Sequence, residues 1–304
     1  MRKEIIFVFA LLIGLVSCSE QKSEVAQLLQ DKISEVGVNY GEVIVMETAT
    51  GNIVEQICLD KEGKPYEDSF NDEDRIVIYA PTYLALLDSG INPTDTFDIG
   101  NGIYVVDGDT IKDHNWERGG YGKLTLEEAF CRNSKIAFAK AMTDSINNYL
   151  EGNNIQSLLS FYNKLAQDTT TENVQLLKKA MRLNITNELG KLANSEKVEI
   201  AAHGRTFQID DDTYRMEFCG FFPFNSPKFT VIVVMGKDDY PVTILRGINS
   251  NQYYDDASKT MIETIIYGNP TRVKALKGNN GNFEIGKGLY SYIESPNNNR
   301  NDIS

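Results

Sequence analysis

The hydrophobic period changes twice along this chain, and the order of the changes restricts the folds that it can adopt. Alternating or short apolar runs typical of strands occur near both ends, at residues 42–46, 53–58, 198–202, 215–222 and 229–235. Between them, apolar residues recur every three or four positions, as in amphipathic helices. Strands at both ends of a helical block favour one antiparallel sheet with helices packed on it over a doubly wound parallel sheet. The sequence therefore predicts an α+β fold.

Residues 75–140 form the centre of the helical block. A helical pattern runs from Ile76 to a predicted end near Gly90, and Pro81 within it should either lie in the first turn or kink the helix. Thr125 and Glu128 have the spacing of a capping box, which predicts a helix start after a loop at 92–122 that is rich in glycine. Further helices are predicted at 25–33, 136–142, 155–166, 173–183 and 255–267.

The first residues have the pattern of a targeting signal. Arg2 and Lys3 precede an apolar run from Ile5 to Val16, which is too short to span a bilayer. The run ends in LVSC and so resembles a bacterial lipobox, in which the cysteine, here Cys18, is acylated and becomes the mature N-terminus. We expect residues 1–17 to be a lipoprotein signal peptide and residues 18–23 a tether that joins the lipid in the bacterial envelope to the folded domain.

Charge and cysteine content exclude several functions. The formal net charge is −13, and removal of Arg2, Lys3 and Glu4 with the signal would leave −14. An acidic chain argues against nucleic-acid binding. The cysteines that would remain contain no C-x-x-C pair, so no metal site is predicted, and no glycine-rich phosphate loop follows a strand, so no cofactor is predicted. These cysteines could form one disulfide, or all three could be buried thiols, and the second alternative is favoured. These cysteines are Cys58, Cys131 and Cys219.

Several segments, in a fixed order, resemble one family. The first is the hairpin pattern GEVIVMETATGNIV at residues 41–54. The others are Leu84–Gly90, Thr94–Asp98, Asp109–Asp113, Trp116, Gly119–Gly122, Leu124–Ala129, Ala137–Phe138, Gly220–Pro223 and Pro227–Val234. They resemble the transpeptidase domain of penicillin-binding proteins, most closely the class B type. The resemblance implies a five-stranded antiparallel sheet flanked by helices over residues 24–268, with the active site at the sheet edge. The remaining residues, 269–304, are rich in Asn and Gly, which predicts a loosely ordered polar tail.

Catalysis in that family depends on three motifs. A serine and a lysine in S-x-x-K begin a helix, so that one turn brings the base beside the nucleophile. The S-x-N motif relays protons and holds substrate, and K-[ST]-G on the facing strand grips a carboxylate.

Each motif departs from the family pattern in this chain. Counting back without gaps from Leu84, S-x-x-K falls on Ile76-Val77-Ile78-Tyr79, and an isoleucine has no lone pair with which to attack. The triplet Asn133-Ser134-Lys135 replaces S-x-N, and His203-Gly204-Arg205 replaces K-[ST]-G. No catalytic residue is therefore predicted.

The polar residues at these positions each have two interpretations. Tyr79 could act as a general base or nucleophile, but its helical spacing favours a core residue. Ser134 is disfavoured as a substitute nucleophile because the adjacent Lys135 would not face it. His203 is expected to be a partly solvated strand or loop residue.

Two further side chains are candidates for ligand binding, together with His203 and Ser134. Arg205 could hold a peptide carboxylate through two hydrogen bonds or form a salt bridge. Trp116 could stack on a ligand or anchor its loop.

The sequence thus favours an envelope lipoprotein whose transpeptidase-like domain is inactive and binds a peptidoglycan stem peptide or a cell-wall synthesis protein. Two alternatives remain: a D,D-transpeptidase or carboxypeptidase with an unrecognised serine, and a purely structural platform.

Overall fold

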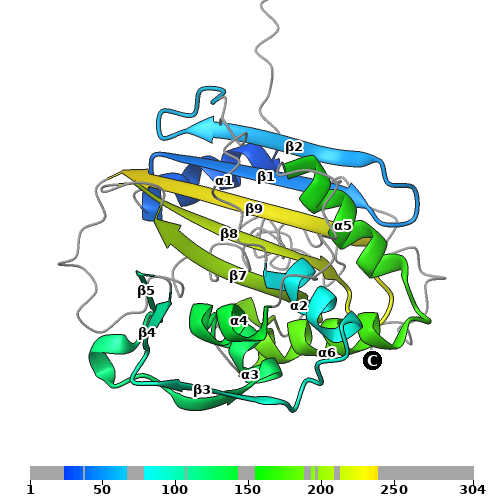
Figure 1. Ribbon diagram of the computed structural model, residues 1–304. Helices are drawn as coiled ribbons and strands as arrows, with labels where there is room; N and C mark the ends of the chain where they lie inside the picture. The colour runs from blue at the N-terminus through cyan, green and yellow to red at the C-terminus, as the bar shows by residue number, and fades with distance from the viewer. Residues whose placement is uncertain are drawn as a thin grey trace, which may run out of the picture.

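The computed structural model describes residues 24–36, 38–66, 79–106, 108–142, 155–187, 193–195, 198–208 and 213–238 (Figure 1). The expected signal peptide, Cys18, Ile76 to Ile78, the helix at 255–267 and the tail at 269–304 lie outside these residues. Within them, no helix is long and apolar enough to cross a membrane.

Helices and strands follow the predicted order. The helices are α1 (Glu24–Val36), α2 (Tyr79–Asp88), α3 (Leu126–Cys131), α4 (Lys135–Ala141), α5 (Ile155–Gln167) and α6 (Glu172–Asn187), with a short 3-10 helix η1 (Trp116–Arg118). The strands are β1 (Tyr40–Glu47), β2 (Ile53–Asp60), β3 (Thr96–Gly100), β4 (Ile103–Val106), β5 (Asp109–Lys112), β6 (Gly122–Thr125), β7 (Ala201–Gln208), β8 (Thr213–Phe222) and β9 (Phe229–Asp238).

Five strands form one antiparallel sheet in the order β2-β1-β9-β8-β7, which confirms the predicted α+β fold. Strand β1 is buried on both faces, so Val43 and Val45 join the core on the α1 side, while Ile44 joins the core on the side of α2 to α6 (Figure 1). In the described part of the chain, the sheet thus lies between α1 on one face and the helices α2 to α6 on the other.

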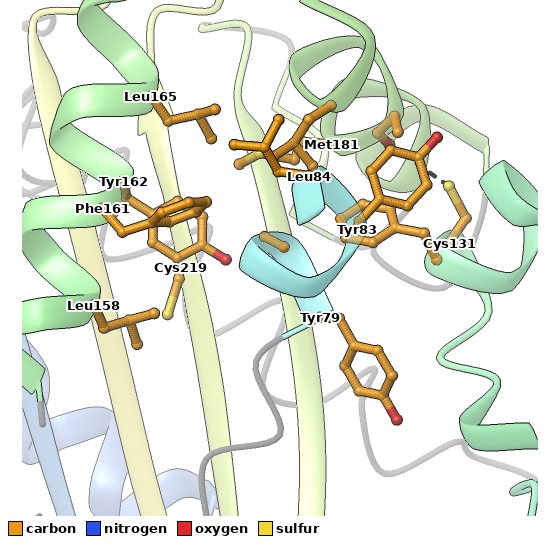
Figure 2. Close-up of a cluster of buried hydrophobic side chains, with 14 of the residues drawn as sticks. Tyr79, Tyr83, Leu84, Cys131, Leu158, Phe161, Tyr162, Leu165, Met181 and Cys219 are labelled. Atoms are coloured by element: carbon orange, nitrogen blue, oxygen red, sulfur yellow. Dashed lines mark hydrogen bonds between the residues drawn. The ribbon is translucent and has the colours of Figure 1, made fainter. Parts of the chain in front are cut away.

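The larger core lies between the sheet and the helices α2 to α6. Figure 2 shows α5 packed over β8, with Leu158, Phe161 and Tyr162 beside Cys219. On the other side of α2, Tyr83 lies beside Cys131 of α3. Leu84, Leu165 and Met181 belong to the same core. This packing holds α2, whose first residue Tyr79 stands at the position of the family's lysine, in the core.

Local signals in the sequence have their expected structural consequences. Thr125 caps α3 and forms the complete capping box with Glu128. Pro81 lies in the first turn of α2, and the loop at 92–122 contains only short strands. Cys131 and Cys219 are buried free thiols, whereas Cys58 is free but only half-buried, so the expectation of three buried thiols is wrong for Cys58.

One strand prediction is displaced. The sequence predicts a strand at 198–202, but β7 begins at Ala201 and continues to Gln208. The carbonyl of Ile200 accepts a hydrogen bond from Arg182 of α6, so the chain before Ala201 is held by a helix. Ladder pairing with β8 extends the strand through His203, Gly204 and Arg205, whose side chains do not alternate in hydrophobicity.

Candidate functional site

The fold brings the positions of the three altered motifs together. Tyr79 is the first residue of α2, Asn133 and Ser134 connect α3 to α4, and His203 and Gly204 lie on β7. The ring centroids of Tyr79 and His203 are 5.7 Å apart, and Asn133 Nδ2 donates to the Gly204 carbonyl at 3.1 Å. The segments that carry the three altered motifs therefore lie side by side, and the chemistry of the site depends on their side chains.

Tyr79 is a core residue, as its spacing predicts. Its side chain is 4 % exposed, and its ring meets that of Phe138 edge-on at 4.9 Å. Figure 2 shows this ring directed away from the cluster around Tyr83 and Met181. Where the family has a lysine, this chain has an aromatic ring packed between α4 and β7.

His203 is also interior, and the expectation of a partly solvated residue is wrong. It is 4 % exposed, stacks on Phe130 at 4.4 Å, and its Nε2 lies 3.2 Å from the Phe130 carbonyl. A carbonyl only accepts, so Nε2 carries a hydrogen and donates. The ring of Phe130 covers the imidazole and so explains its burial. Phe130 belongs to α3, more than 70 residues earlier in the chain, so this contact could not be predicted from the residues around His203.

Ser134 is fully buried and has a structural task. Its hydroxyl accepts from the Ala137 amide at 3.2 Å as the N-cap of α4, and it donates to Asp113 Oδ2 at 2.7 Å. The other carboxylate oxygen of Asp113 accepts from the Ile136 amide at 3.2 Å. Ser134 is thus an interior residue that is not presented to a ligand, and the neighbouring Lys135 is exposed.

Among the described strands, β7 is an edge strand of the sheet, and this edge is the remaining polar feature of the site. Strand β7 is the last in the sheet, and backbone groups of alternate residues point away from its partner β8. Three side chains donate to carbonyls on this edge: Arg182 to Ile200 at 3.0 Å, Asn184 to Ala202 at 3.2 Å and Asn133 to Gly204 at 3.1 Å.

Arg205 lies on β7 directly opposite Glu217 of β8, and its side chain is outside the described part. Glu217 is buried and lies 3.5 Å from Arg215 Nε. A salt bridge and a ligand contact both stay open for Arg205.

Trp116 is half-buried, and the ammonium of Lys112 lies 4.0 Å from the centre of its ring. A cation over the ring occupies the face on which a ligand would stack, which favours the loop-anchoring interpretation.

Three residues that shape the site were not predicted from the sequence: Asp113, Arg182 and Asn184. Asp113 falls within a segment that carries the family resemblance, which is the one signal that could have indicated it. Arg182 and Asn184 are two residues apart on α6, and nothing local in the sequence indicates that they reach β7. No group of three or more metal-binding side chains occurs among the described residues.

Known structures match this arrangement of elements. A peptidoglycan glycosyltransferase from Burkholderia ambifaria aligns with 86 % of this chain and 96 % of its own, with a TM-score of 0.58 and 14 % identity. The transpeptidase domain of penicillin-binding protein 3 from Burkholderia pseudomallei aligns with 83 % of this chain and 93 % of its own, with a TM-score of 0.59 and 16 % identity.

The transpeptidase domain of the D,D-transpeptidase FtsI4 from Legionella pneumophila aligns with 80 % of this chain and 97 % of its own, with a TM-score of 0.53 and 13 % identity. No family model matches the sequence, and no curated protein matches it. The chain thus has the fold of penicillin-binding protein transpeptidase domains, as its sequence motifs suggested.

Proposed function

We propose that this chain is a transpeptidase-like module that does not acylate and that binds an extended peptide of the cell wall, while a lipid on Cys18 holds it in the bacterial envelope. One observation carries the proposal. At the position of the catalytic lysine, Tyr79 is buried and contacts Phe138 and His203.

The chemistry of acyl transfer requires more than the fold. A hydroxyl nucleophile needs a base within hydrogen-bonding distance and donors for the developing oxyanion. Ile76 supplies no nucleophile, and the Tyr79 ring faces aromatic neighbours. Ser134, the nearest hydroxyl in the altered motifs, is buried and donates to Asp113. These features support a module without acylation.

Peptide binding requires fewer functional groups than acyl transfer does. An extended peptide adds to a sheet edge through main-chain hydrogen bonds, and a nearby cation selects for a carboxylate. Strand β7 is such an edge, and Arg205 lies on it. A stem peptide that ends in a free carboxylate fits both requirements.

A synthetic stem peptide ending in D-alanyl-D-alanine tests the proposal. We expect the peptide, labelled with fluorescein, to bind the full chain reversibly and to leave the intact mass unchanged. Arg205→Ala should weaken binding at least fivefold, whereas Lys135→Ala should not, because Lys135 is exposed on α4. Hydrolysis or transfer of the terminal D-alanine would instead establish a D,D-carboxypeptidase or transpeptidase.

Absence of peptide binding in every variant would contradict the ligand that we propose. Specific capture of a cell-wall synthesis protein would then favour the partner-binding alternative, and absence of both would favour a structural platform.

A further inference from the structure

The carbonyl of Ile200, directly before β7, and the outward carbonyls of Ala202 and Gly204 on β7 each accept a side-chain hydrogen bond. Two of the donors, Arg182 and Asn184, belong to α6. The third, Asn133, belongs to the turn between α3 and α4. An exposed edge strand can pair with another chain, so these side chains protect the edge at the positions that they cap.

Asn133 differs from the other two donors in how it is held. It is the one non-glycine residue with a positive φ, 53°, in the described part of the chain, and it joins two helices of six and seven residues. Its Nδ2 donates to Gly204, and its Oδ1, like the Oδ1 of Asn184, is buried with no hydrogen-bond partner among the described residues. Asn184 lies within the 16-residue helix α6, whereas Asn133 lies in a turn between two short helices. One neutral hydrogen bond is a weak attachment for such a turn.

The Asn133 contact uses a group that an added strand would need. Along β7 the backbone groups of Thr206 and Gln208 point to the same side as those of Gly204, because the direction alternates with every residue. An extended peptide that pairs with this edge would place an N–H against the Gly204 carbonyl. That carbonyl already accepts from Asn133 Nδ2 at 3.1 Å.

We infer that Asn133 is an autoinhibitory latch, which holds the α3–α4 turn against β7 and must release Gly204 before an extended peptide can pair with the full edge. The inference rests on the proposed peptide binding for its ligand, but the latch itself is a property of the unliganded chain. Arg182 and Asn184 then act as fixed caps, because α6 packs along β7.

Asn133→Gly isolates the latch, because glycine keeps the left-handed backbone and removes only the amide. We expect the labelled stem peptide to bind this variant about three- to tenfold more tightly than the unaltered chain, which is the effect of removing one ordinary hydrogen bond from the closed state. Backbone amides at residues 204–208 should also exchange with deuterium faster. Asn184→Ala is the matched control: it removes the same donor from α6 and should lower stability without raising affinity.

The two measurements separate the latch from the proposed function. Unchanged exchange and unchanged affinity in a folded Asn133→Gly variant would overturn the latch, and so would an equal affinity gain in Asn184→Ala. Faster exchange at residues 204–208 with no peptide bound by any variant would support the latch and contradict the ligand.

Discussion

Replacing Ser134 with alanine removes two interactions of one buried hydroxyl. Ser134 accepts from the Ala137 amide as the N-cap of α4, and it donates to the buried carboxylate of Asp113 at 2.7 Å. Loss of an N-cap costs about 1 kcal/mol. Loss of a hydrogen bond to a charged group costs about 1.5–3 kcal/mol. Ser134→Ala should therefore lower the free energy of unfolding by about 2–4 kcal/mol.

Urea denaturation followed by circular dichroism measures this loss, with Ser89→Ala as the control. Ser89 donates to the Leu86 carbonyl at an exposed helix end, and its replacement should cost less than about 0.5 kcal/mol. A double-mutant cycle with Asp113→Asn should show a coupling above about 0.5 kcal/mol, because the two side chains are in contact. A loss below about 1 kcal/mol for Ser134→Ala, or a loss of ligand binding with stability unchanged, would refute the structural role of Ser134.

Three further predictions concern stability, pH and membrane attachment. Tyr79→Lys restores the family's residue but buries an ammonium against Phe138, so the free energy of unfolding should fall by about 3 kcal/mol or more; an undiminished denaturation midpoint would show that the site is open to water. Asp168 accepts from the hydroxyl and amide of Thr171 and from the amide of Thr170, and these bonds lower its pKa to about 2. Because the charged form makes these bonds, their contribution is complete above about pH 4 and disappears as the pH falls through about 2. The stability deficit of Asp168→Asn, about 1 kcal/mol at pH 7 for weakened hydrogen bonds in the turn between α5 and α6, should therefore shrink over that range, whereas a deficit that is constant with pH would argue against this cause. Finally, Cys18→Ala should move the chain from the membrane to the soluble fraction of cells that express it, and persistent membrane association would exclude the proposed lipid anchor.

The arrangement of the fold followed from hydrophobic period and local signals. The hairpin of β1 and β2, the capping box at Thr125 and the helices α5 and α6 each depend on residues close together in sequence. Such features are visible without a structure because neighbouring residues alone establish them.

The candidate site was harder to predict because its contacts join distant segments. The burial of His203 depends on Phe130, and the role of Ser134 depends on Asp113, 21 residues away. The caps on β7 come from Asn184 and from Asn133, which is 71 residues from Gly204. The structure places Tyr79 near His203 and Asn133 near Gly204, but whether polar side chains there face solvent is decided by packing, which a single sequence does not specify.

Reaction with a β-lactam tests most directly the proposal that this chain has no acylating nucleophile. The full chain would be incubated with a fluorescent penicillin alongside a catalytically competent penicillin-binding protein, and both would be analysed by gel fluorescence and intact-mass spectrometry. We predict a labelled band and an adduct for the competent protein, and neither for this chain. An adduct equal in mass to the penicillin, mapped to any serine of this chain, would contradict the account.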